Sequence, residues 1–453
     1  MNERIMRNTT LALAAIPFFS ALSAQEKPNI VVIMADDLAS NEISCYGGRN
    51  LKTHNIDRIA EEGVRFTNNY ASCTMSVPIR ASMYTGLYPV RHGSYQNHKA
   101  SYPDLKSITH YLPQAGYKVA RTGKTHTRPK SVYDFQEIPG FEVNCVAPTA
   151  DYTVDGIREF MKKDDQPFCL FVCSTNPHVP WTVGNPDEFD ADKIILPPNC
   201  VDNKETRGLF RSYLAEIRAL DDEVGAVLKV LEEIGKLDNT LVIFLGEQGP
   251  QLPFGKWTCW NYGQSSALVA RFPKRIKAKT TSEAIVQYED ILPTLMDFAG
   301  GDKIDGIDGK SFLKALYGKE KRHRQFAYGI HNNIPEGTAY PIRSIRDNCY
   351  KLIINLTPEA DYFEKHMMNV KNRKQVWANW LESAETDSKA KFLVDKFVKR
   401  PAIEFYDMQK DPWEMNNLAG DEKYKGKIAY MKSELENWMK QQGDKGAEMD
   451  VKF

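Results

Sequence analysis

Asn29-Ile30-Val31-Val32-Ile33-Met34, followed by Ala35-Asp36-Asp37-Leu38, is the stretch that decides the fold. The first six residues are apolar and rich in β-branched side chains, which is typical of a parallel strand buried on both faces. Residues 169–173 and 240–245 have the same character, and residues 213–234 between them carry apolar side chains at helical spacing. Strands that alternate with such helices predict an α/β fold with βαβ units around a parallel sheet.

Polar residues follow the first and third of these strands directly. Asp36 and Asp37 follow the first, and Glu247 and Gln248 follow the third, within Gly246–Gly249. Open α/β sheets bind ligands beyond the carboxyl ends of their strands. Two adjacent carboxylates repel each other unless a cation lies between them, and Ca²⁺ prefers carboxylate and amide oxygens. An acidic pair alone is more often a turn or a helix cap, so the metal interpretation depends on the segments described below.

The N-terminal residues predict export. Arg4 and Arg7 precede an apolar run over residues 11–22, and Ser23-Ala24-Gln25 follow it. A basic start, a short apolar run and small residues are typical of a secretory signal peptide, here residues 1–24. We therefore expect a periplasmic or secreted protein. The run is too short to span a bilayer comfortably and no later segment is more apolar, so we expect no stable membrane span.

Composition and charge narrow the class of protein. The chain has 453 residues with 59 Lys plus Arg and 59 Asp plus Glu, so its balanced charge gives no support for a nucleic-acid partner. The eight cysteines are spaced singly rather than as zinc ligands. After about residue 322 the pattern changes to short strand-like runs and a last amphipathic helix near residues 430–439. We expect a catalytic domain over residues 25–322 and a smaller α+β subdomain over residues 323–453.

A motif near the N-terminus carries a family resemblance. Ser76-Val77-Pro78-Ile79-Arg80 continues to Thr85-Gly86-Leu87-Tyr88-Pro89. This stretch resembles the active-site motif of the type I sulfatases, in which the first residue is oxidised to formylglycine. The resemblance implies an alkaline-phosphatase-like sandwich, with a large mixed, mostly parallel sheet between helices. It also implies a nucleophile made from Ser76 and a formylglycine-generating maturase as a partner.

Further segments match the same family in order. They are Ala35–Leu38, Gly123-Lys124-Thr125-His126, Pro177-His178-Val179-Pro180 and Gly255-Lys256. The resemblance implies one Ca²⁺ with Asp36, Asp37, Ser76, Glu247 and Gln248 as ligands. This chain departs from the family pattern at Glu247 and Gln248, because the family usually has Asp followed by Asn or His at these two positions. Fixed cations aimed at a sulfate ester stabilise charge where it develops, which suits Arg80, Lys124 and Lys256.

The mechanism that the resemblance implies uses both histidines. One hydroxyl of the hydrated formylglycine attacks sulfur, while His178 protonates the departing sugar oxygen or nitrogen. His126 then helps to remove the proton of the second hydroxyl, and sulfate leaves.

A finer resemblance is to the heparan N-sulfatase (N-sulfoglucosamine sulfohydrolase)-like branch. It depends on residues 124–129, on Pro253-Phe254-Gly255-Lys256 and on residues 340–344. The predicted sugar-binding residues are Asn97, His98, Glu336 and Arg343. Lys256 stands where that branch tends to have Arg, which favours an O-sulfate ester on a glycan sugar over N-sulfoglucosamine.

Two other classes of function stay open. A phosphatase or phosphodiesterase of the same superfold would use unmodified Ser76, although Pro78 and Arg80 resemble the modification motif. A sulfated-glycan receptor without catalysis would not need both His126 and His178.

Overall fold

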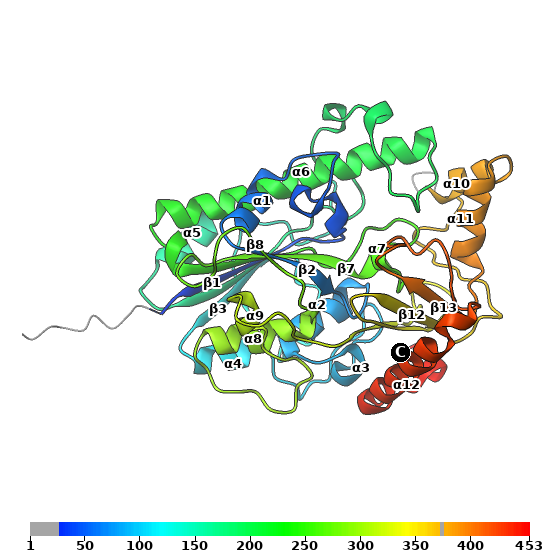
Figure 1. Cartoon of the computed structure of the whole chain (residues 1–453). Coiled ribbons are helices and arrows are strands. Elements are labelled where there is room, and N and C mark those ends of the chain that lie inside the picture. The colour runs from blue at the N-terminus through cyan, green and yellow to red at the C-terminus, as the bar shows by residue number, and fades with distance from the viewer. Residues whose placement is uncertain (1–26, 372–375) are drawn as a thin grey trace, which may run out of the picture.

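The computed structural model describes residues 27–371 and 376–453. The predicted signal peptide, residues 1–24, lies outside these described residues. Two sheets and their helices make up the described part of the chain (Figure 1).

The larger sheet has nine strands in the order β4-β3-β5-β1-β6-β7-β2-β8, with β9 also paired to β2. β7 is antiparallel to both of its neighbours, and the other pairs are parallel, so the predicted mixed, mostly parallel sheet is confirmed. The strands are β1 (Asn29–Met34), β2 (Val64–Tyr70), β3 (Lys118–Gly123), β4 (Gln136–Glu137), β5 (Phe168–Cys173), β6 (Thr240–Leu245), β7 (Ser265–Arg271), β8 (Thr280–Ser282) and β9 (Val286–Gln287).

Helices cover both faces of this sheet, as Figure 1 shows. Alternate side chains of β1 enter two separate apolar cores, because successive residues of a strand point to opposite faces. Val31 and Ile33 pack with the α6 side, and Ile30 and Val32 pack with the α2 and α8 side. The helices are α1 (His54–Glu61), α2 (Ser76–Thr85), α3 (Pro89–His92), α4 (Ile108–Gln114), α5 (Asp155–Lys162), α6 (Lys204–Glu233), α7 (Asn261–Gln264), α8 (Ile291–Phe298) and α9 (Leu313–Leu316).

Helix α6 begins nine residues before the apolar pattern that predicted it. The Asn203 side chain accepts a hydrogen bond from Thr206 N at 2.8 Å and so caps the helix. The first two turns are mostly polar, which is why apolar periodicity did not reveal them.

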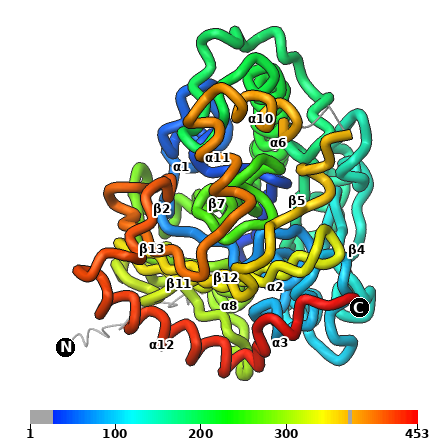
Figure 2. The backbone as a smooth tube through the Cα atoms, turned by 90° about the vertical axis from the view of Figure 1, so that its right-hand side faces the viewer, coloured from blue at the N-terminus to red at the C-terminus, as the bar shows by residue number. Residues whose placement is uncertain are grey.

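The smaller sheet is antiparallel, with the order β10-β11-β12-β13. Helix α12 lies beneath it in Figure 2, and Trp438 of α12 stacks on Tyr328 of β10 with ring centroids 4.8 Å apart. The predicted smaller α+β subdomain is confirmed, whereas its boundary at residues 322 and 323 stays a prediction. Its elements are β10 (Ala327–His331), β11 (Ile342–Arg346), β12 (Tyr350–Asn355), α10 (Trp377–Ala384), α11 (Ser388–Val398), β13 (Ile403–Asp407) and α12 (Lys425–Gln442).

No helix within the described residues is long and apolar enough to cross a membrane.

Candidate active site

The carboxyl ends of β1 and β6 bring four predicted ligands together. The two strands pair in parallel, with Met34 opposite Leu245, so the residues after them leave the same edge of the sheet. Asp36, Asp37 and Glu247 are buried, and carboxylate oxygens of the three lie within 4.8 Å of one another. The Gln248 amide Nε2 donates to Asp37 Oδ1 at 2.6 Å. The predicted juxtaposition of the two strand ends is therefore observed.

Ser76 is the first residue of α2, and its side chain points into this carboxylate cluster. Ser76 Oγ lies 3.3 Å from Asp36 Oδ1 and 3.2 Å from Glu247 Oε2. Arg80 follows one helical turn later and therefore lies on the same side of the helix. Its Nε donates to Glu247 Oε1 at 2.7 Å. The helix thus supplies both the candidate nucleophile and a fixed cation.

Two lysines from other loops complete the charge balance. Lys124 directly follows β3, and its Nζ donates to Asp36 Oδ2 at 2.5 Å and to Ser76 Oγ at 3.1 Å. Lys256 Nζ donates to Asp37 Oδ2 at 2.8 Å. Burial alone would raise the pKa of Asp36, but the Lys124 ammonium and its other neighbours hold that pKa well below its usual range. Three buried carboxylates therefore face three buried cations.

The buried polar atoms fit a bound Ca²⁺. Gln248 Oε1 is buried without a hydrogen-bond partner, while its Nε2 points at the carboxylates. Turning this amide end for end would place Oε1 beside Asp37, Glu247 and Ser76 Oγ, giving an all-oxygen donor set of the kind that Ca²⁺ prefers. Burial raises the pKa of Glu247 to about 8, although the charge of Arg80 acts to lower it. A dication bound nearby would favour the ionised form of this carboxyl group. With Ca²⁺ bound, the balanced cluster would gain positive charge and attract an anion.

The backbone is strained at both metal-binding loops. Asp37 and Glu247 have φ angles of 66° and 70°, in the left-handed region that side chains with a Cβ rarely adopt. Such conformations cost roughly 1–3 kcal/mol each and cluster at functional sites. His98, His126 and Trp257 share this conformation and line the adjoining cavity. This grouping of strained residues supports a functional interpretation of the site independently of the sequence motifs.

His178 faces the cluster in a defined orientation. Its Nδ1 donates to Val179 O at 2.6 Å, and Lys256 Nζ donates to its Nε2 at 3.1 Å. Burial, followed by the charge of Lys256, lowers the pKa of His178 to about 4. Burial, followed by the charge of Lys124, lowers the pKa of His126 to about 2. Both shifts favour the neutral form of the imidazole ring.

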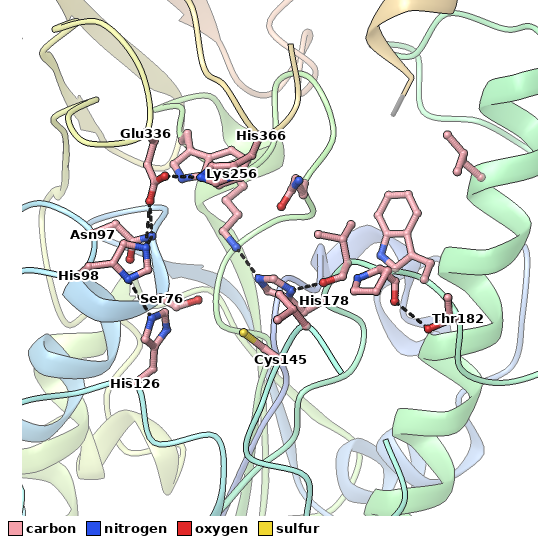
Figure 3. Close-up of a pocket in the computed structure, with 17 residues that line it drawn as sticks. Ser76, Asn97, His98, His126, Cys145, His178, Thr182, Lys256, Glu336 and His366 are labelled. Atoms are coloured by element: carbon pink, nitrogen blue, oxygen red, sulfur yellow. Dashed lines mark hydrogen bonds and ion pairs between the residues drawn. The ribbon is translucent and has the colours of Figure 1, made fainter. Parts of the chain in front are cut away.

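A cavity of about 710 Å³ opens above Ser76 (Figure 3). Asn97, His98 and Glu336 line it as predicted. The buried Glu336 carboxylate accepts a hydrogen bond from Asn97 Nδ2 at 2.6 Å and lies 3.3 Å from His98 Nε2. It also lies 2.6 Å from Nε2 of His366, a residue that sequence reasoning missed. Glu336 is therefore fixed at one side of the cavity by three side chains from two other segments of the chain.

Sequence reasoning missed other lining residues too. Trp257 stacks on His366 with centroids 5.7 Å apart, and its position next to Lys256 is a signal that was present. The cavity is also lined by His366 and Cys145, which lie in irregular segments without a recognised motif. Neither periodicity nor a motif therefore gave a signal for these two residues. Trp181 also lines the cavity, and its position directly after the Pro177–Pro180 motif could have identified it from the sequence.

The pocket prediction for Arg343 was wrong. Arg343 belongs to β11, is fully buried and does not line the cavity. Its Nη2 donates to Asp444 Oδ1 at 2.8 Å, and its Nη1 donates to Asn332 Oδ1 at 3.1 Å. The side chain forms an internal ion pair instead of facing a ligand, and it does not pair with Glu336.

The segment around Asp444 and Asp450 supports the loop that carries Glu336. Asp450 accepts hydrogen bonds from the backbone N–H groups of Asn333, Ile334 and Tyr340 at 2.7–2.8 Å. On the other side, Gln96 Nε2 donates to Val451 O at 2.8 Å, next to Asn97. Residues 444–451 thus hold both loops that meet at the Glu336 carboxylate.

Replacing Arg343 with alanine is expected to destabilise the protein by about 3–5 kcal/mol, because it leaves Asp444 buried without its partner. Denaturant unfolding would measure this change. Lys391→Ala, which breaks the exposed Lys391–Asp395 pair, is the control and should change the free energy of unfolding by less than about 0.5 kcal/mol. A stable Arg343→Ala variant that loses activity only on sugar substrates would contradict the structural role.

Comparisons with known proteins agree with this geometry. Residues 28–301 match the Sulfatase family, and residues 251–396 match the family described as N-sulphoglucosamine sulphohydrolase, C-terminal. An ulvan-active sulfatase of Formosa agariphila is 33% identical over 94% of this chain and 82% of its own length. Human N-sulphoglucosamine sulphohydrolase is 25% identical over 94% of this chain and 93% of its own length.

The chain therefore belongs to the sulfatase family. It is a sulfuric ester hydrolase, and both the predicted family and the predicted enzyme class are confirmed.

A solved protein with its substrate D-glucosamine-2-N,6-O-disulfate shares the fold, with a TM-score of 0.72 and 24% identity over 94% of this chain and 100% of its own. The phosphonate monoester hydrolase of Agrobacterium radiobacter has a TM-score of 0.71 and 19% identity over 92% of this chain and 96% of its own. The predicted alkaline-phosphatase-like fold is confirmed. The roles assigned to individual site residues stay predictions.

Proposed function

We propose that the chain is an exported carbohydrate sulfatase that hydrolyses an O-sulfate ester on a glycan sugar, with a nucleophile made from Ser76. The observation that carries the proposal is the position of Ser76 Oγ, which lies among Asp36, Glu247 and Lys124 at the floor of a cavity with Glu336 at its side. A carboxylate accepts hydrogen bonds from sugar hydroxyls. Relatives named as acting on ulvan, on N-acetylglucosamine-6-O-sulfate and on N-sulphoglucosamine support a sulfated saccharide.

The cationic side chains would bind the sulfate group. Lys124 contacts Ser76 Oγ, Lys256 contacts Asp37 and His178, and Arg80 has two buried nitrogens, Nη1 and Nη2, without hydrogen-bond partners. Each such donor contributes roughly 2.7–4 kcal/mol to transition-state stabilisation in comparable sites. A Ca²⁺ held by Asp36, Asp37, Ser76, Glu247 and Gln248 would add positive charge there. Oxidation of Ser76 to formylglycine by a maturase, followed by addition of water to the aldehyde, would supply a carbon that carries two hydroxyls.

The histidines would move the protons. The Nε2 of His178 receives a hydrogen bond from Lys256 and has its other nitrogen fixed by Val179 O. To act as the acid, His178 must gain a proton at Nε2 and present it to the leaving oxygen, which requires Lys256 Nζ to turn from that nitrogen towards the sulfate group. His126 Nδ1 is buried without a hydrogen-bond partner, which leaves it free to accept a proton from the nucleophile.

N-sulfoglucosamine is the second candidate substrate. The match of residues 251–396 and the human relative favour it, whereas Lys256 in place of the branch's usual Arg favours an O-sulfate. Sulfate release from a panel of O-sulfated and N-sulfated monosaccharides tests the choice. Exclusive release from N-sulfoglucosamine would overturn the O-sulfate assignment.

Replacing Glu336 with glutamine is expected to lower kcat/KM for the preferred sugar sulfate at least about tenfold. The same variant should change kcat/KM for nitrophenyl sulfate less than about twofold, because the sulfate-binding cations stay in place. Steady-state rates on both substrates would measure the ratio. Glu359→Gln, an exposed change in the same subdomain, is the control. Equal losses on both substrates would refute a sugar contact by Glu336.

A further inference from the structure

The cavity continues beyond His178 on the side away from Glu336. In Figure 3, His178 lies between Glu336 on one side and Thr182 on the other. Thr182 lines the cavity on this side, with its hydroxyl donating to Pro148 O at 2.8 Å. The adjoining lining includes five apolar residues from three segments, here called the apolar wall: Val146, Val179, Pro180, Trp181 and Leu209. Val146 is 58% exposed. An exposed apolar surface that adjoins an active site is a candidate binding surface.

The Trp181 segment of the apolar wall is held in place by several contacts. The indole N–H of Trp181 donates to Pro177 O at 3.0 Å, and its ring packs against Tyr213 with centroids 5.3 Å apart. The next two residues, Thr182 and Val183, donate their backbone N–H groups to Glu216 Oε1 at 2.7 and 3.1 Å. Glu216 is 1% exposed and forms no ion pair within the described residues. Its buried carboxylate thus fixes the loop that presents Trp181.

The chemistry of the wall defines what it can hold. The polar group of Trp181 is already satisfied, so the indole offers the cavity only its apolar surface. None of the five wall residues carries a charge, whereas Lys124, Lys256 and Arg80 lie at the Ser76 end. A second sulfate or a uronate carboxylate would lose its hydration here without gaining a cation. The C–H face of an uncharged sugar ring would cover the indole without such a penalty.

The volume of the cavity is also larger than one sugar ring would fill. A cavity of about 710 Å³ is within the roughly 300–1,000 Å³ range of pockets that enclose drug-sized ligands. A sulfated sugar whose sulfate lies at Ser76 and whose hydroxyls reach Glu336 leaves the wall uncovered. We infer that the apolar wall is a subsite for an uncharged sugar residue linked to the sulfated one, so that the substrate is a disaccharide or longer. This inference rests on the proposed function.

Trp181→Ala tests the subsite. kcat/KM is measured on a sulfated monosaccharide, on a disaccharide that joins this sugar to a neutral one, and on nitrophenyl sulfate. The wild-type protein should prefer the disaccharide to the monosaccharide at least about tenfold. Trp181→Ala should lose at least about tenfold on the disaccharide and less than about twofold on the monosaccharide. Trp413→Ala is the matched control, because Trp413 is also partly buried against a tyrosine, Tyr262, but lies outside the cavity.

Leu209→Asn is the second variant, and it leaves the Trp181 loop intact. Leu209→Asn should also lower the preference for the disaccharide over the monosaccharide. The subsite can therefore still be tested if Trp181→Ala unfolds. A wild-type protein that cleaves the monosaccharide and the disaccharide equally well would overturn the subsite while leaving the sulfatase function standing. A loss confined to nitrophenyl sulfate in Trp181→Ala would overturn it in favour of an aromatic ligand. A wild-type protein that releases sulfate from none of the sugars would instead refute the proposed function.

Discussion

Replacing Ser76 with alanine is expected to lower kcat for sulfate release by at least about a thousandfold, on sugar and aryl sulfates alike. The reason is that Ser76 Oγ is the atom on which Asp36, Glu247 and Lys124 converge, and alanine leaves them with nothing to orient. The fold should persist, because the side chain that is removed is small and α2 continues on its own backbone hydrogen bonds. Initial rates, together with near-UV circular dichroism of both proteins, would measure the two effects.

Ser82→Ala is the matched control on the same helix. Its Oγ contacts His92 Nε2 at 3.1 Å, away from the carboxylates, and the variant should keep most of its activity. The mass of the peptide that contains Ser76 in the native enzyme provides a second measurement. A peptide lighter by two hydrogens supports formylglycine, whereas an unmodified serine in fully active enzyme would exclude it.

Removal of Ca²⁺ is the second large effect that we expect. Chelation should abolish sulfate release and lower the thermal unfolding temperature, because a ligand that binds only the folded state adds about 2.7 kcal/mol of stability at a hundredfold excess over its Kd. The protein should remain folded without the ion, since Arg80, Lys124 and Lys256 still pair with the three carboxylates. Added Ca²⁺ should restore both activity and unfolding temperature.

Asp37→Asn separates the metal from other effects of chelation. This variant should lose the shift in unfolding temperature that Ca²⁺ produces, because one of three close carboxylates is neutralised. Asp421→Asn, at an exposed capping residue, should keep the full shift. Unchanged activity and stability after chelation, or recovery with Zn²⁺ but not Ca²⁺, would contradict the assignment.

The strands at the centre of the fold could be predicted from the sequence, and so could the convergence of several candidate site residues. The buried strands around residues 29–34 and 240–245 are marked by apolar runs, and the polar residues after them had to leave one edge of a parallel sheet. Ser76, Arg80, Lys124 and Lys256 lie in contiguous motifs, and the structure brings them within hydrogen-bonding reach of the carboxylates. His178, also in a motif, lies 3.6 Å from Asp37 Oδ2 and contacts Lys256.

The outer cavity could not be predicted in the same way. Arg343 has the charge that a sugar contact needs, but the direction of its side chain depends on Asp444, about a hundred residues away. Trp181 owes its position to Tyr213 and to Glu216 of another helix. Loops without periodicity take their conformation from such tertiary contacts, and these contacts leave no local pattern in the sequence.

The central position of β1 has a consequence for how the protein is made. Both partners of β1 are encoded far downstream, since β5 begins at Phe168 and β6 at Thr240. At about 5–20 residues per second, a ribosome needs roughly 10–40 s to synthesise the chain from β1 to the end of β6. During that time β1 lacks partners on both edges until β5 is made and on one edge until β6 is made, which is a condition that favours aggregation. Chaperone capacity during synthesis, more than the stability of the finished protein, should therefore limit the yield of soluble enzyme.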